Sequence, residues 1–239
     1  MGDKREKNRL GIEHGFISFV VLIVFVVGDR KLSQAGYQCI FLEAPHILPM
    51  TSMVYIEGQR VEIENGKREN ARAWFLYSDT DPSDATRAQS GEPLTYGGLN
   101  EALEVVQSTI INDTDPREPV ALLGFSQGAV LAHLVAAIDR DLHPTFQRIT
   151  HAILSSGFPA AHVPNANSPF RFRSFEDIPL PSLHLIGKKD TSVLPAQSVA
   201  LANKFRFPKF LYHEKGHIIP QQSALCASIV KFLSSEAEA

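Results

Sequence analysis

Apolar and polar positions follow two alternating patterns in the second half of the chain. Short runs with almost no polar residue are typical of strands covered on both faces, and longer stretches carry apolar residues at helical spacing. The predicted strands are Val120–Gly124, Ile149–Ser155, Leu183–Ile186 and Lys209–His213. The predicted helices are Tyr96–Ile111, Gln127–Ile138, Val193–Phe205 and Ser223–Leu233. This alternation predicts an α/β fold with a mostly parallel central sheet and helices on both faces.

The first half of the chain is less regular. Tyr37–Leu42 is rich in strand formers, and Val54–Ile63 has the polarity of a hairpin or loop excursion. Two long irregular stretches, Ser78–Pro93 and Gly157–Asp177, have a length that is uncommon unless the loop is functional or mobile. Because no repeat and no Gly/Ser linker divides the chain, we expect a single domain over residues 1–239, with an atypical segment at 1–35.

The apolar run Phe16–Val27 follows a basic N-terminal stretch and ends at Asp29–Lys31. A membrane-spanning helix needs about 20 residues, so the run is too short for one. Three interpretations are open: a buried strand or helix of the domain, a secretory signal or interfacial membrane anchor, and an error in the gene model. We favour the first, because removal of the segment would take away a piece that the fold needs.

Composition excludes some classes of function. The chain has 23 Lys+Arg against 26 Asp+Glu and no long basic block, which argues against nucleic-acid binding. Its 44% hydrophobic residues are enough for a large core. Cys39 and Cys226 lie in apolar stretches and could pair, but we predict that they are buried, reduced thiols of a cytoplasmic protein. Membrane contact is expected only if Phe16–Val27 is an anchor.

The motif G-x-S-x-G at Gly124–Gly128 stands between a predicted buried strand and a predicted helix. This context is typical of a nucleophile elbow, a sharp strand-to-helix turn that presents a serine in strained backbone angles. Ser126 is therefore the predicted nucleophile. The backbone N–H of Gln127, at the start of the helix, is a predicted oxyanion donor.

A serine nucleophile needs a base and a carboxylate that orients the base, and in this architecture they follow in the order Ser, Asp or Glu, His. Asp190 comes just after a predicted strand, whereas its competitor Asp177 has no strand directly before it. Of the two later histidines, His213 falls inside a predicted strand and His217 in the loop that follows. We therefore predict Asp190 as the acid and His217 as the base.

These residues bring the chain close to a known family. It resembles the small serine hydrolases of the α/β-hydrolase superfamily that include the yeast family serine hydrolases. The matching blocks include Ala44–His46, Ala71–Phe75, Leu123–Ala129, Ser156–Phe158, Pro181–His184 and Gly216–His217. The resemblance implies an α/β-hydrolase fold, a carboxylesterase or thioesterase activity without metal or cofactor, and a triad of Ser126, Asp190 and His217.

The resemblance is weakest at the front of the chain. Relatives have a first strand that ends in a Leu-His-Gly-aromatic motif, which supplies the second oxyanion donor. Here Arg9–Phe16 echoes that motif, and Phe16 or Ile17 is the implied donor, but Gly11 and Glu13 depart from the strand pattern. A lost oxyanion donor costs about 10²–10³ in kcat. The alternative hypothesis is therefore a catalytically weak or inactive binding protein with a degenerate oxyanion loop.

The substrate expected from the resemblance is a small-molecule ester or thioester, cleaved through an acyl-enzyme. Aromatic residues in or beside the irregular segments are predicted to wall an apolar acyl pocket at the carboxyl edge of the sheet. They are Trp74, Phe75 and Phe158, joined by Phe170 and Phe172. The alternative is that they are ordinary core residues.

Overall fold

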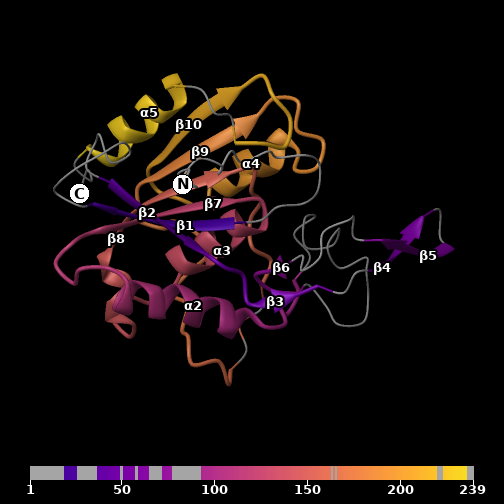
Figure 1. The fold of residues 1–239 in the computed structure, drawn as a ribbon, viewed down its shortest axis with the longest axis horizontal. Coiled ribbons are helices and arrows are strands. Elements are labelled where there is room, and N and C mark those ends of the chain that lie inside the picture. The colour runs from indigo at the N-terminus through magenta and orange to yellow at the C-terminus, as the bar shows by residue number, and fades with distance from the viewer. Residues whose placement is uncertain are drawn as a thin grey trace, which may run out of the picture.

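The computed structural model in Figure 1 describes residues 19–25, 37–48, 51–56, 59–64, 72–76, 93–162, 164, 166–219 and 223–235, with the backbone alone for 19–25, 51–56 and 59–64. Its strands are β1 (Phe19–Phe25), β2 (Tyr37–Leu42), β3 (His46–Ile47), β4 (Thr51–Ile56), β5 (Gln59–Glu64), β6 (Arg72–Ala73), β7 (Val120–Phe125), β8 (Ile149–Ser155), β9 (Ser182–Gly187) and β10 (Pro208–His213). Its helices are α2 (Leu99–Asn112), α3 (Gln127–Ala136), the 3₁₀ helix η1 (Pro144–Arg148), α4 (Pro195–Ala202) and α5 (Ser223–Leu233).

The central sheet has six strands in the order β10-β9-β8-β7-β1-β2. The four strands from β7 to β10 are parallel to their neighbours, and β1 is antiparallel to both β7 and β2. The four strands predicted in the second half are present, and the predicted α/β class with a mostly parallel sheet is confirmed. Residues Phe19–Phe25 form β1, as the first interpretation of the N-terminal apolar run expects.

Helices cover both faces of this sheet (Figure 1). On one face, α2, α3 and α4 bury a large apolar cluster against alternate strand residues such as Val120, Leu122 and Leu154. On the other face, α5 packs against a smaller cluster that includes Ala121 and Ile153. Because neighbouring residues of β7 and β8 enter opposite clusters, both strands are apolar throughout, which is the pattern that identified them in the sequence.

Several predicted boundaries are wrong. The helix predicted from Tyr96 begins at Leu99, because Gly98 has a left-handed φ of 70° and Gly97 exchanges backbone hydrogen bonds with Leu76. The helix predicted over Val193–Phe205 is shorter and spans Pro195–Ala202. At the start of α2, the left-handed backbone of Gly98 and the hydrogen bonds of Gly97 thus override the apolar periodicity.

Two of the irregular segments predicted in the first half of the chain have different outcomes. The predicted excursion at Val54–Ile63 is a hairpin of β4 and β5, whereas Ser78–Pro93 lies almost wholly outside the described residues.

Cys226 is exposed on α5 and Cys39 is half-buried, so the prediction of two buried thiols is wrong for Cys226. No helix among the described residues is long and apolar enough to cross a membrane.

Candidate active site

Ser126 occupies the sharp turn between β7 and α3. Its backbone has φ 55° and ψ −121°, a strained conformation for a residue with a side chain, and its N–H donates to the Ser155 carbonyl at 3.0 Å. A Cβ on Gly124 would lie 2.2 Å from the Gly128 carbonyl oxygen, so only glycine lets the helix start this close to the strand. The strain is thus held by the sheet on one side and by helix packing on the other.

Asp190 lies in the turn after β9 and is buried. Its Oδ1 accepts hydrogen bonds from the backbone N–H groups of Ser192 and Val193, both at 3.0 Å. Burial alone would raise the pKa of this carboxyl, but hydrogen bonds from His217 and Val193 and the proximity of the imidazole outweigh it, and the pKa is lowered. Asp190 is therefore ionised at neutral pH, and its backbone hydrogen bonds hold the carboxylate in place.

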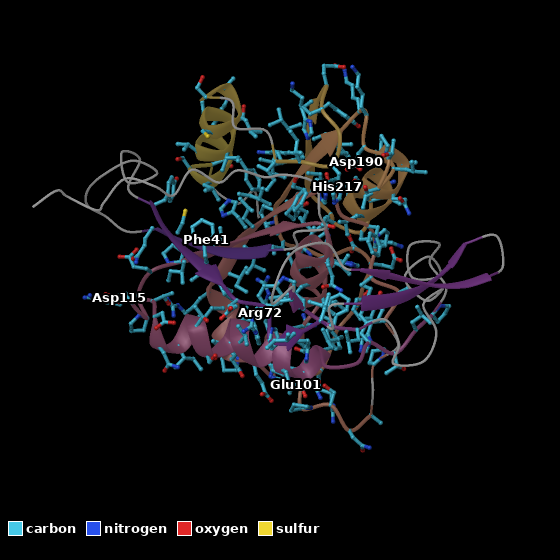
Figure 2. All side chains as sticks on the ribbon, turned by 45° about the vertical axis from the view of Figure 1, so that its right-hand side comes forward. Phe41, Arg72, Glu101, Asp115, Asp190 and His217 are labelled. Carbon is cyan, nitrogen blue, oxygen red and sulfur yellow. The ribbon has the colours of Figure 1, made fainter. Side chains whose placement is uncertain are left out.

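His217 lies in the loop after β10 and connects the other two residues. Its Nδ1 is 2.9 Å from Asp190 Oδ2, and its Nε2 is 3.1 Å from Ser126 Oγ. Figure 2 shows Asp190 and His217 side by side at the same end of the sheet. The His217 ring also packs against Phe125, with centroids 4.8 Å apart. The serine, the imidazole and the carboxylate thus form one continuous hydrogen-bonded series.

The loops that carry Asp190 and His217 contact each other directly. The N–H of Lys188 donates to the His213 carbonyl at 2.9 Å, and that of Lys189 to the Lys215 carbonyl at 3.2 Å. A Cβ on Gly187 would lie 2.6 Å from the Gly216 carbonyl oxygen, so this approach requires a residue without a side chain. Backbone contacts therefore set the relative position of the Asp190 carboxyl group and the His217 ring.

Asp177 and His213, the alternative candidates for the acid and the base, have other partners. Asp177 is paired with Arg206 through two contacts, at 2.9 and 2.6 Å, and this pairing lowers its pKa. His213 is at the end of β10, where its Nδ1 accepts the N–H of Lys215. The hydrogen bond to Ser126 Oγ comes from His217, and the carboxylate bonded to His217 is that of Asp190, so the geometry favours Asp190 and His217.

Of the two predicted oxyanion donors, Gln127 lies within the described residues. Gln127 is the first residue of α3, so its N–H has no acceptor inside the helix and lies beside Ser126. Phe16 lies outside the described residues. The strand that follows it, β1, begins at Phe19, which pairs with Phe125 next to the elbow.

The aromatic residues predicted for the acyl pocket are buried in the core. Trp74 and Phe75 have no exposed surface, and Phe158 is 3% exposed. Phe170 is also buried and contacts Phe146 of η1. Phe172 is only partly buried and packs on Phe175. That these residues line a substrate pocket stays a prediction.

Sequence reasoning missed one polar feature of the elbow. The side chain of Gln127 hydrogen-bonds to the backbone of both Trp74 and Phe75. Its place inside the motif gives no signal for this contact, because the motif leaves that position free. Among the described residues, no group of three or more His, Cys, Asp and Glu side chains could hold a metal ion.

Comparisons with known proteins identify the family of the chain. A family model described as "Serine hydrolase (FSH1)" matches residues 28–229. The chain is 32% identical to the human esterase OVCA2 over 211 residues, which are 87% of each chain. It is 34% identical to the mouse esterase OVCA2 over 212 residues, again 87% of each chain. Among solved structures, Zea mays acyl-protein thioesterase 2 matches 69% of this chain and 74% of its own, with 20% identity and a TM-score of 0.42.

Proposed function

The chain belongs to the serine hydrolase (FSH1) family, and we propose that it hydrolyses carboxylic esters or thioesters of small molecules through a Ser126–His217–Asp190 triad and an acyl-enzyme. The observation that carries the proposal is the series of contacts from Ser126 Oγ through His217 to Asp190, at 3.1 and 2.9 Å. The name esterase, which its relatives carry, is consistent with the hydrolysis of esters.

In the first half of the reaction, Ser126 Oγ attacks the substrate carbonyl carbon while His217 Nε2 takes the hydroxyl proton. Asp190 holds the other imidazole nitrogen protonated and stabilises the imidazolium that forms. The negative charge that develops on the carbonyl oxygen is stabilised by the Gln127 N–H and the dipole of α3, with Phe16 as the second proposed donor. His217 then protonates the departing alcohol or thiol, which leaves the acyl group on Ser126.

In the second half, water replaces the leaving group. His217 removes a proton from the water as it attacks the acyl carbon, and the tetrahedral intermediate uses the same donors. Collapse of this intermediate breaks the bond to Ser126 Oγ, which recovers its proton from His217. The products are the free acid and the original enzyme.

The test uses a fluorophosphonate probe and a panel of esters and thioesters on the purified full chain. We expect the wild type to be labelled and to hydrolyse substrates of both kinds, and Ser126→Ala to lose labelling and turnover while it keeps its circular dichroism spectrum. Full turnover by Ser126→Ala would exclude Ser126 as the nucleophile. A folded wild-type chain that is neither labelled nor active would favour a binding protein with a degenerate oxyanion loop.

A further inference from the structure

The side chain of Gln127 bonds the elbow to a segment far away in the sequence. Its Oε1 accepts the Trp74 N–H at 2.9 Å, and its Nε2 donates to the Phe75 carbonyl at 2.8 Å. One primary amide thus pairs with a donor and an acceptor on adjacent residues. Asparagine is too short to reach as far, and a carboxylate lacks the donor, so the contact suits glutamine.

The segment that Gln127 contacts is fixed in the core. The side chains of Trp74 and Phe75 are fully buried, and the Phe75 ring stacks on Tyr96 with centroids 4.6 Å apart. Leu76 and Gly97 exchange two backbone hydrogen bonds of 2.8 Å each. Residues 72–76 are therefore joined to residues 94–98, directly before α2.

A third segment is joined to these two. The Tyr96 hydroxyl accepts the Ala161 N–H at 2.8 Å, and the Tyr96 N–H donates to His162 Nδ1 at 3.2 Å. The N–H of Leu94 donates to the Ala161 carbonyl at 2.8 Å. Residues 158–162 follow the end of β8, which itself accepts the N–H of Ser126. We call residues 72–76, 94–98 and 158–162 the rim segments.

We propose that Gln127 is a positioning residue whose side-chain amide docks the rim segments beside Ser126 and so fixes the wall that receives the acyl group. The consequence for substrates rests on the proposed function, whereas the docking itself does not. The side chain and the backbone N–H of Gln127 have separate tasks, because any substitution except proline keeps the N–H.

The test replaces Gln127 with methionine, which has a similar length but no amide. The Trp74 N–H and the Phe75 carbonyl then lose their hydrogen bonds to the Gln127 amide, and the loss of hydrogen bonds to buried groups is unfavourable, so the segment is expected to shift. Trp74 is the only tryptophan in the chain and reports this shift by its fluorescence. We expect Gln127→Met to move the emission to longer wavelength and to increase quenching by acrylamide.

The second arm measures kcat/KM for acetyl and decanoyl esters. For Gln127→Met we expect the ratio of decanoyl to acetyl to fall about tenfold, the scale of a lost apolar contact in a substrate pocket. The matched control is Gln147→Met, because the Gln147 amide also donates to a backbone carbonyl, that of Arg140, but this hydrogen bond is exposed to solvent. The control is expected to keep the emission and the acyl-length profile of the wild type.

Each outcome decides a part of the proposal. Unchanged emission in Gln127→Met would overturn the docking role, and shifted emission with an unchanged ratio would overturn the role in acyl recognition. If Gln127→Met does not fold, hydrogen exchange of the Trp74 amide in the wild type decides the docking role: protection supports it, and rapid exchange contradicts it. A wild type without labelling or turnover defeats the proposed function, while emission and exchange still decide the docking.

Discussion

Two sides of Ser126 differ in how they are connected to the sheet. One carries Asp190 and His217 and is called the acid–base side after their proposed roles. The other carries the rim segments and is called the rim side. Asp190 and His217 follow β9 and β10, which are neighbouring parallel strands, and backbone hydrogen bonds join their loops. The rim segments come from three separate parts of the chain and reach the elbow through the side chain of Gln127. The order of strands therefore positions Asp190 and His217, whereas side chains of α3 connect the rim segments to the elbow helix.

This difference predicts which changes are tolerated. A substitution on the acid–base side acts on groups whose place is set by backbone, so its effect falls on the chemistry. A substitution on the rim side removes a contact between segments, so its effect falls on substrate preference and on stability.

Deletion of residues 1–35 is expected to have the largest effect. It removes β1, which lies between β7 and β2 and pairs with both, so the nucleophile strand loses a neighbour. We expect the 36–239 fragment to be insoluble and unreactive. Expression tests, circular dichroism and serine-probe labelling check this. A soluble fragment that reacts with the probe would show that β1 is dispensable for the fold.

Asp190→Asn is expected to lower kcat by about 10⁴, the loss seen when the orienting carboxylate of a serine-protease triad is replaced by its amide. Asparagine cannot stabilise the imidazolium and favours the wrong tautomer of His217. The control is Asp177→Asn, which breaks only an exposed pair with Arg206. Steady-state kinetics on one ester compare the two variants, and equal losses would contradict the choice of Asp190.

The acid–base side was also the part most open to prediction from sequence. Its residues follow apolar strands whose order along the chain matches their order in the sheet, so the place of Asp190 beyond β9 and of His217 beyond β10 could be inferred. The antiparallel direction of β1 could not, because the run Phe16–Val27, with eleven apolar residues and Ser18, carries no information on strand direction. The contacts of Gln127 and the burial of Trp74 depend on folding of distant segments, which local patterns do not encode.

Gly187→Ala tests the close approach of the two loops. The added methyl group would lie 2.6 Å from the Gly216 carbonyl oxygen, so the loop that carries His217 must move. A displacement of about 1 Å at a catalytic group costs about 10² in rate. We expect a loss of this size in kcat with little change in KM. Wild-type kinetics in Gly187→Ala would show that the loops adapt without moving the imidazole.

The rim side has a second connection to α3, and this one is sensitive to acid. His133 on α3 is fully buried, and its Nδ1 accepts the N–H of Ala160 at 3.0 Å. Burial lowers the pKa of His133 to about 4, and the nearby charge of Lys204 acts in the same direction. Protonation would turn the accepting nitrogen into a donor and break the connection.

The pKa of His133 lies below its unfolded value of 6.5, so the unfolded chain binds the proton more readily between these two values. The stabilisation by neutral His133 is complete above pH 6.5 and is lost as the pH falls toward about 4. The two pKa values correspond to about 3 kcal/mol over this range. We expect His133→Asn, whose amide oxygen can accept the same N–H without titrating, to flatten the decline of the urea midpoint between pH 7 and 4.5. His143→Asn is the matched control, because His143 also accepts a backbone N–H but is only partly buried. Equal slopes in wild type and His133→Asn would mean that acid weakens the fold elsewhere.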